Sequence, residues 1–304
     1  MKTQREISIT RELDICLERM SHLPDGGRNW RELYFAQPEG YRALTMQLTV
    51  PAGDMPAPVV VYIHGGGWLF GHPNVQHPHL AAMALFDKLH AAGYAVARAS
   101  YRLSAEGKFP TQLHDLKAAI RYLRHHAARF GIDAARIGVI GESAGGHLAV
   151  LLGLDTPPEF EGEVGVTGPT SKVQAVVSWY GITDFLTLDA QRIPGSPFTH
   201  DAADSASSRL LGQTISANPD AARAASPVTW VTADAAPCLI QHGTADLVVP
   251  PGQGRELFDL LQLSGVPAEF RPVAGANHCF VGASTDPIVA DVIAFLDQHL
   301  QQAE

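Results

Sequence analysis

The sequence predicts an α/β fold in which a mostly parallel, eight-stranded sheet is covered by helices on both faces. Three observations lead to this prediction. Short β-branched runs alternate with helical stretches along most of the 304 residues, as in units of strand, helix and strand. Several apolar runs are nearly continuous, as in strands that are buried on both faces. The composition, 46% hydrophobic and 17% charged, supplies enough apolar side chains for one large core.

Two kinds of residue pattern predict the strands in the N-terminal half of the sheet. Its first two strands roughly alternate apolar and polar residues, which is typical of antiparallel strands with one solvated face. The next two are short and apolar, as expected at the centre of a sheet. The predicted strands are residues 30–36, 41–50, 59–64 and 94–100. The predicted helices are residues 79–92 and 111–130, and each is followed by a glycine that can end it.

The C-terminal half repeats the alternation around one interruption. Its predicted strands are residues 136–140, 173–179, 238–242 and 268–273, and its predicted helices are residues 144–154, 252–264 and 287–299. The interruption, residues 182–234, is rich in Ser, Ala, Pro and Asp and shows only short helical pieces. We expect a single domain over residues 1–304, with 182–234 as an insertion over the active site, because ligands bind beyond the carboxyl ends of the strands in such sheets.

Charge and cysteine content exclude several classes of function. The net charge is −9, and no basic stripe is present, so neither nucleic acid nor an anionic membrane surface is an expected partner. The three cysteines, Cys16, Cys238 and Cys279, suggest neither a disulfide framework nor a zinc site. The first twenty residues contain no signal-peptide core, and the longest apolar stretches are too short to span a bilayer. We expect a cytoplasmic protein; whether it forms a homodimer is left open.

The strongest chemical signal is the segment 141–145, which reads Gly-Glu-Ser-Ala-Gly. It follows a predicted strand and opens a predicted helix, which is the setting of a nucleophile elbow. The turn is so tight that the flanking positions must lack bulk, and Gly141 and Gly145 satisfy this requirement. The new helix points its amino end at the site where negative charge will develop. We therefore predict that Ser143 is the nucleophile.

A glycine run at 64–68, His-Gly-Gly-Gly-Trp, directly follows the predicted strand 59–64. Three glycines let the backbone curl so that its amide groups converge on an oxyanion. A flexible turn is the alternative interpretation, and the position of the run ahead of Ser143 in the same sheet disfavours it. We expect His64, at a buried strand end, to satisfy loop hydrogen bonds rather than to take part in catalysis.

Two further loops follow predicted strands and supply an acid and a base. One ends in Asp246 and the other in His278. The chain order serine, aspartate, histidine is that of α/β-hydrolases and not of other serine-hydrolase folds. His278 would take the proton of Ser143, and Asp246 would hold the imidazole in the required tautomer. Asp184 remains the main rival for the acid. We expect structural roles for three other polar residues near these motifs, His147, His242 and Asp115.

Five aromatic residues follow predicted strand ends or lie beside these loops, where pockets of such folds open. They are Trp68, Phe70, Trp179, Tyr180 and Phe280. We expect them to line the substrate pocket, although two or three of the five could simply belong to the core. The histidines 72, 77 and 79 lack nearby carboxylates, and no glycine-rich dinucleotide motif is present. No metal and no cofactor are therefore expected.

Together these motifs resemble the HGGG-type esterases related to hormone-sensitive lipase. The resemblance runs from about residue 29 to residue 298. The segments that carry it are HGGGW at 64–68, YRLS at 101–104, GESAGGHLA at 141–149 and HGTAD at 242–246. Glu142 and His147 make the sequence most similar to the bifunctional feruloyl and acetylxylan esterase-like branch. Ala105 departs from the proline that is frequent in relatives.

The resemblance implies an α/β-hydrolase fold and an oxyanion hole formed by the amides of Gly66, Gly67 and Ala144. It also implies no cofactor and a preference for short acyl or aryl esters. We therefore expect a serine carboxylesterase that acts on a small-molecule ester through an acyl-enzyme. An arylformamidase or other amidase would use the same triad, and a comparison of ester and N-formyl substrates separates the two. A non-catalytic receptor on this fold would be expected to lack a triad residue.

Overall fold

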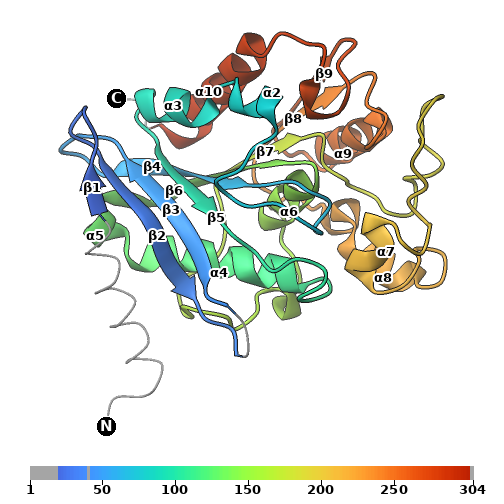
Figure 1. The fold of residues 1–304 in the computed structure, drawn as a ribbon, viewed down its shortest axis with the longest axis horizontal. Coiled ribbons are helices and arrows are strands. Elements are labelled where there is room, and N and C mark those ends of the chain that lie inside the picture. The colour runs from blue at the N-terminus through green and yellow to red at the C-terminus, as the bar shows by residue number, and fades with distance from the viewer. Residues whose placement is uncertain (1–19, 40–41, 302–304) are drawn as a thin grey trace.

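The nearly continuous apolar run predicted at 59–64 forms β4 (Ala57–Ile63), in which every residue is buried. The computed structural model describes residues 20–39 and 42–301, so expectations on residues 1–19, Tyr41 and Cys16 lie outside the described residues. Strand β4 lies near the centre of one sheet in the order β1-β2-β3-β5-β4-β6-β7-β8-β9 (Figure 1). The other strands are β1 (Met20–His22), β2 (Arg28–Ala36), β3 (Leu44–Val50), β5 (Ala95–Ala99), β6 (Ile132–Glu142), β7 (Ala175–Trp179), β8 (Cys238–Gly243) and β9 (Ala268–Val273).

The sheet is antiparallel at its N-terminal edge and parallel elsewhere. Strands β1, β2, β3 and β5 pair antiparallel in that order, and all remaining pairs, from β5–β4 to β8–β9, are parallel. The alternation predicted for the strand at 41–50 is present in β3, along which buried and half-buried residues alternate. The chain has the α/β-hydrolase fold predicted from its sequence.

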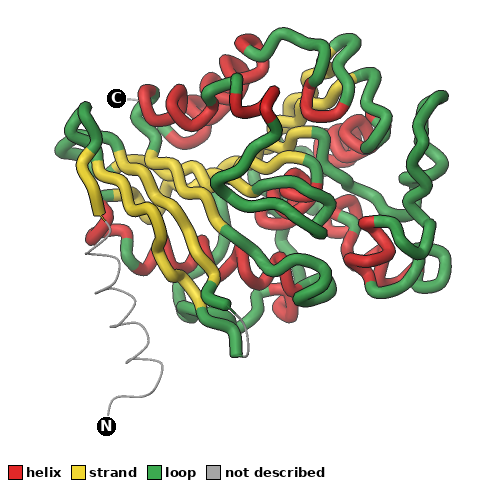
Figure 2. Tube along the Cα trace, in the orientation of Figure 1, coloured by secondary structure: helices red, strands yellow, loops and turns green. Residues whose placement is uncertain are grey.

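Helices cover both faces of this sheet, as Figure 2 shows in red against the yellow strands. They are α2 (Pro78–Ala81), α3 (Leu85–Ala91), α4 (Thr111–His125), α5 (Ala127–Phe130), α6 (Ala144–Leu152), α7 (Ala206–Leu211), α8 (Pro219–Ala225), α9 (Pro251–Leu263) and α10 (Asp286–Leu300). Single 3₁₀ turns are η1 (Pro158–Phe160), η2 (Pro227–Trp230) and η3 (His278–Phe280). Buried residues of α4, α6 and α9 join one hydrophobic cluster, and those of α3 and α10 join a second cluster on the opposite face.

Three predicted elements differ from the structure. The prediction of eight strands was wrong, because Met20–His22 pairs with β2 as a ninth; three residues give no readable alternation. The helix predicted at 79–92 is broken at Ala84, whose φ of 49° lies in the left-handed region. The helix predicted at 111–130 divides at His126 into α4 and α5.

The segment 182–234 contains α7, α8 and η2, and specific hydrogen bonds tie it to the helices α9 and α6. The side chain of Gln253 accepts hydrogen bonds from the amides of Thr183 and Asp184 at 2.8 Å each. At the other end of the segment, the imidazole of His147 contacts the carbonyl oxygen of Ala225 at 2.8 Å. The segment is therefore held beside the carboxyl ends of the strands.

Candidate active site

Ser143 stands between β6 and α6 in a strained backbone conformation, with φ of 54° and ψ of −119°. The surrounding backbone leaves no room for side chains at the flanking glycines. A Cβ at Gly141 would lie 2.0 Å from the carbonyl oxygen of Gly145, and one at Gly145 would lie 2.1 Å from that of Ile63. The glycines of the Gly-Glu-Ser-Ala-Gly motif thus permit the close approach that exposes the serine hydroxyl above the sheet.

The structure brings the three residues of the predicted triad together. Nε2 of His278 lies 3.1 Å from Oγ of Ser143, and its Nδ1 lies 2.8 Å from Oδ2 of Asp246. The second carboxylate oxygen of Asp246 accepts hydrogen bonds from the amides of Val248 and Val249 at 2.8 and 2.9 Å. One imidazole therefore connects the hydroxyl to a fixed carboxylate, which is the geometry that activates a serine.

Asp246 is 1% exposed, and a second histidine lies beside it. Nε2 of His242 is 3.6 Å from Oδ2 of Asp246 and 3.0 Å from the carbonyl oxygen of Val249. Burial alone would raise the pKa of Asp246, but hydrogen bonds from His242 and His278 hold it well below its ordinary value. Asp246 is therefore an ionised acceptor at neutral pH.

The rival acid, Asp184, lies in a different network. Its Oδ1 accepts hydrogen bonds from the amide of Leu186 at 2.9 Å and from the hydroxyl of Ser226 at 3.3 Å. The recorded partners of its carboxylate thus belong to the segment that follows β7, and none of them is a residue of the predicted triad.

Three other polar residues near the motifs, His147, Asp115 and His64, are buried and form structural contacts. His147 is fully buried one turn along α6, and burial lowers its pKa to about 4. Asp115 forms an ion pair with Arg102, with a shortest distance of 2.6 Å. His64 is buried as well, and its ring stacks on that of Tyr101 with centroids 4.4 Å apart.

The glycine run after β4 forms a tight turn beside Ser143. Gly66 and Gly67 have φ of 103° and 60°, and the carbonyl oxygen of Gly66 accepts hydrogen bonds from the amides of Leu69 and Phe70. Ala144 is the first residue of α6, so its amide has no acceptor within its own helix. The three predicted oxyanion donors thus lie on the glycine loop and at the start of α6, beside Ser143; their role remains a prediction.

A cavity of about 930 Å³ opens over Ser143 and His278. Its walls come from the glycine loop, from the segment 70–77 and from the insertion. The insertion residues that line it are Ile182, Pro197, Phe198, Thr199, His200, Ala202, Asp204, Ser205, Ala206 and Ser207. Of the five aromatic residues predicted for the pocket, Trp68 and Phe70 line this cavity.

The prediction was wrong for Trp179, Tyr180 and Phe280, which are fully buried and do not line the cavity. Trp179 follows the two-residue period of β7 onto the face covered by α10, where its indole donates a hydrogen bond to Gln241 at 2.7 Å. The ring of Tyr180 packs edge-on against the imidazole of His278 and against Phe280, with centroids 4.7 and 4.8 Å apart. These residues support the triad from behind.

Glu142, whose carboxylate had no role predicted from the sequence, also lines the cavity and is 7% exposed. The hydroxyl of Tyr62 donates a hydrogen bond to its Oε1 at 2.8 Å, and that of Tyr180 donates to its Oε2 at 3.3 Å. Its place directly before Ser143 was the available signal, because residues at the carboxyl end of a buried parallel strand lie near the site.

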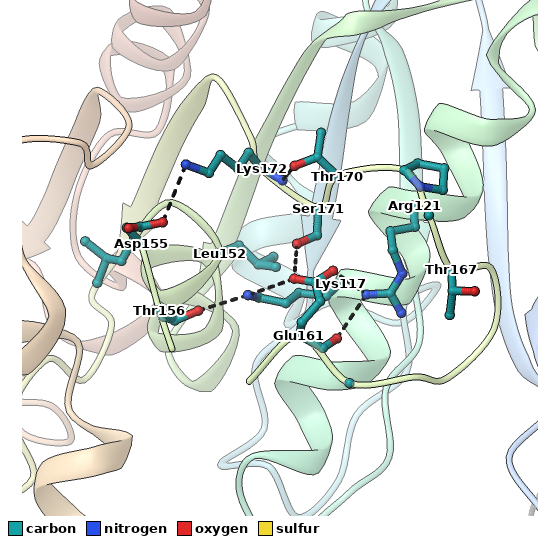
Figure 3. A pocket seen from close by; sticks show the side chains of 14 residues that line it. Lys117, Arg121, Leu152, Asp155, Thr156, Glu161, Thr167, Thr170, Ser171 and Lys172 are labelled. Carbon is teal, nitrogen blue, oxygen red and sulfur yellow. Dashed lines mark hydrogen bonds and ion pairs between the residues drawn. The ribbon is translucent and has the colours of Figure 1, made fainter. Parts of the chain in front are cut away.

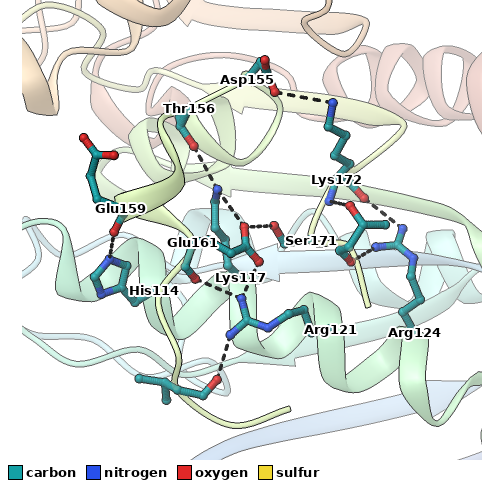
Figure 4. Close-up of polar contacts among 12 residues, drawn as sticks. His114, Lys117, Arg121, Arg124, Asp155, Thr156, Glu159, Glu161, Ser171 and Lys172 are labelled. Atoms are coloured by element: carbon teal, nitrogen blue, oxygen red, sulfur yellow. Dashed lines mark hydrogen bonds and ion pairs between the residues drawn. The ribbon is translucent and has the colours of Figure 1, made fainter. Parts of the chain in front are cut away.

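A second cavity, of about 340 Å³, lies at the opposite end of α6 and is lined by polar residues (Figure 3). Lys117 and Arg121 of α4 point toward Glu161, which directly follows η1. The hydroxyl of Ser171 donates to the same carboxylate at 2.6 Å. Figure 4 shows that Arg124 continues this network along α4 to the backbone near Lys172. The basic groups of this cavity already have protein partners.

Two features are absent from the described ranges, 20–39 and 42–301. These ranges contain no group of three or more histidine, cysteine, aspartate or glutamate residues placed to hold a metal ion. None of the described helices is both long and apolar enough to cross a membrane.

Comparison with known proteins shows that this chain is similar to several proteins named as esterases. A family model described as BD-FAE matches residues 46–261. Esterase LipC of Mycobacterium tuberculosis is 32% identical over 82% of this chain and 60% of its own length. The probable carboxylic ester hydrolase LipM of the same organism is 33% identical over 74% of this chain and 49% of its own. A solved truncated carbohydrate esterase from gut microbiota superposes with a TM-score of 0.78 at 28% identity, over 92% of this chain and 99% of that one.

The chain thus spans about half to three fifths of the length of the two curated relatives. Each of the three proteins is named as an esterase or an ester hydrolase, so these matches give no support to the amidase alternative.

Proposed function

Because the chain belongs to the BD-FAE family, we propose that it is a serine carboxylesterase that cleaves short acyl or aryl esters through an acyl-enzyme. The observation that carries the proposal is the continuous contact from Ser143 through His278 to Asp246 at the floor of a cavity. An inert binding protein would have no need of an activated hydroxyl in a strained turn.

The proposed reaction begins when His278 takes the proton of Ser143 and the serine oxygen attacks the ester carbonyl carbon. The amides of Gly66, Gly67 and Ala144 would stabilise the oxyanion of the tetrahedral intermediate. The imidazolium then donates its proton to the leaving alcohol, and the acyl group remains on Ser143. Water, deprotonated by the same imidazole, attacks the acyl-enzyme and releases the carboxylic acid, which restores the starting state.

The cavity has room for esters with a small acyl part and a larger alcohol part. A volume of about 930 Å³ exceeds what an acetyl or butyryl group fills, so we propose that an aryl or sugar group occupies the remainder. Phe70 and Phe198, which are 68% and 44% exposed, line this cavity and offer surfaces on which a ring can stack.

The test compares purified wild-type protein with Ser143→Ala on 4-nitrophenyl acetate and butyrate, and on feruloyl, acetyl-sugar and N-formyl substrates. We expect the variant to retain at most about 10⁻³ of the wild-type turnover, because the hydroxyl is the covalent attacker. An unchanged circular dichroism spectrum controls for folding. Near-parental ester turnover by Ser143→Ala would refute the proposal, and faster cleavage of N-formyl substrates than of esters would favour an amidase.

A further inference from the structure

The cavity over Ser143 has an uneven charge distribution. Its described lining residues include two carboxylates, Glu142 and Asp204, but no lysine and no arginine. Two of the lining histidines do not offset these charges at neutral pH, because burial lowers the pKa of His64 to about 4 and also lowers the pKa of His200. The fixed charge that a substrate meets in this cavity is therefore negative.

Glu142 carries the interior part of this charge, and two tyrosines hold its carboxylate in one position. Both of its carboxylate oxygens accept phenolic hydrogen bonds, from Tyr62 and from Tyr180. Burial, together with the adjacent carboxylate, raises the pKa of both phenols well above the ordinary value, so both remain donors. The carboxyl group lies against the glycine loop, since a Cβ at Gly65 would be 3.2 Å from its carbon.

No recorded ion pair within the described residues neutralises Glu142, whereas two other buried acids have basic partners. Asp115 pairs with Arg102, and the buried Asp246 contacts two histidines. Glu142 instead has neutral hydroxyl donors behind it and the cavity in front of it. A ligand that carries positive charge could supply the counter-charge to Glu142 that the protein does not.

We propose that Glu142 makes the active site selective for charge, so that it accepts uncharged and cationic esters and rejects esters that carry a free carboxylate. This inference rests on the proposed esterase function. Its physical basis is the Coulomb interaction, which is several times stronger for a partly buried charge than for one in bulk water, and which salt screens only weakly there. The exposed Asp204 adds a contribution that salt should suppress.

The experiment uses three thioacetates with the same acyl group and the same leaving atom. They are acetylthiocholine, which is cationic, S-(3,3-dimethylbutyl) thioacetate, which is its neutral isostere, and S-acetyl-3-mercaptopropionate, which is anionic. Thiol release gives kcat/KM for each substrate at pH 7.5, at low salt and in 0.5 M NaCl. For the wild-type protein we expect kcat/KM of the cationic ester to exceed that of the anionic ester by about 30-fold or more, with most of the ratio retained in high salt.

Three variants locate the source of the discrimination. Glu142→Gln keeps the size and an acceptor oxygen for Tyr62, and should lower the ratio of cationic to anionic kcat/KM by about tenfold. Glu142→Asp keeps the charge and should retain most of the ratio. Asp204→Asn is the matched control at the rim, and its smaller effect should disappear in 0.5 M NaCl. Because the readout is a ratio within one protein, a general loss of activity in a variant does not affect it.

The outcomes separate this inference from the esterase proposal. If none of the three esters is hydrolysed in a Ser143-dependent way, and the simple esters tested above are not either, the esterase proposal fails. If the neutral ester is hydrolysed but the wild-type ratio is close to one, or Glu142→Gln leaves the ratio unchanged, the inference about Glu142 fails on its own. Should Glu142→Gln fail to fold, the wild-type ratio and the Glu142→Asp ratio still decide the question.

Discussion

Asp246 has two histidine neighbours, and their hydrogen bonds determine its charge. They lower its pKa despite its burial, so the carboxylate contributes stability that is present above its unfolded-state pKa of about 3.9. That contribution is lost as the pH falls through the lower folded-state pKa. The order of the motifs alone suggested Asp246 as the acid, but the sequence could not exclude Asp184, because loop residues on neighbouring strands reach the same sheet edge.

The first prediction separates these two aspartates by their effect on turnover. We expect Asp246→Asn to lower kcat by about 10²–10⁴-fold, since the amide would hold His278 in the wrong tautomer. His278→Ala should be more damaging still. Asp184→Asn, at a site that contacts Leu186 and Ser226, should leave kcat within about threefold of the parent. Steady-state kinetics on one ester measure all three variants, and a crippled Asp184→Asn beside a mild Asp246→Asn would mean that the acid is wrongly assigned.

A second prediction uses two phenylalanines that the sequence could not tell apart. Phe280 is fully buried behind His278, whereas Phe70 is 68% exposed at the cavity. Phe280→Ala should reduce the free energy of unfolding by about 3–5 kcal/mol through the cavity that it leaves. Phe70→Ala should change that free energy by less than about 0.5 kcal/mol and raise KM for aryl esters. Urea denaturation with kinetics on the same samples tests both; equal stability losses would show that Phe70 belongs to the core.

At the scale of elements, the sequence predicted the strands of the parallel part of the sheet well, and the breaks within helices less well. Strand β9 occupies the predicted residues 268–273, because a run bounded by turn residues has clear ends. The broken helix at Ala84 carries no glycine or proline to mark the break, so only tertiary packing decides it. The direction of aromatic side chains at strand ends could not be predicted from the sequence either, since it depends on which face of the sheet each helix covers.

A network of hydrogen bonds and ion pairs joins α4 to the loop that contains Glu161 (Figure 4). Glu161 accepts hydrogen bonds from Lys117, Arg121 and Ser171, and these hold the pKa of Glu161 below its ordinary value although burial alone would raise it. Arg121 is 2% exposed, so removing its carboxylate partner leaves a buried charge without full compensation.

The third prediction follows from this network. Glu161→Gln should lower the free energy of unfolding by about 1–3 kcal/mol at pH 7, less than for a fully buried pair because the Glu161 side chain is 41% exposed. Since the folded-state pKa is lowered, the difference from wild type should shrink as the pH falls below about 4. Lys172→Ala is the matched control, because the exposed Lys172–Asp155 pair, 3.4 Å apart, should contribute about 0–1 kcal/mol. Equal effects of the two variants would contradict this account; kcat should be unaffected in both.

At the scale of the whole molecule, the insertion and the sheet together enclose the site. Residues 197–207 line the cavity opposite the glycine loop, and a Cβ at Gly67 would lie only 3.1 Å from that of Ala206. The Ser- and Ala-rich composition of 182–234 predicted a segment with little apolar surface, and the binding of ligands beyond the carboxyl ends of parallel strands predicted that it lies over the active site. What the composition could not give is the cavity volume, because that depends on how the insertion packs against Gln253 and His147.

The fourth prediction concerns the acyl chain, which this enclosure should limit. Each methylene accommodated gains at most about 0.8 kcal/mol, so a wall discriminates by exclusion rather than by attraction. We expect kcat/KM for 4-nitrophenyl esters to be highest from acetyl to butyryl and to fall beyond about eight carbons. Ile182 lines the cavity and is 5% exposed, so Ile182→Ala should move the optimum to chains longer by about two carbons.

The control is Leu186→Ala, which removes an aliphatic side chain of the same segment that is 41% exposed and does not line the cavity. It should leave the chain-length profile unchanged, because it removes no atom from the wall. A wild-type optimum at dodecanoyl or longer esters would mean that the cavity continues as a tunnel and that the insertion does not bound the acyl site. A profile that Ile182→Ala fails to move would place the acyl group elsewhere, against the 70–77 segment, where Phe70→Ala should then move it instead.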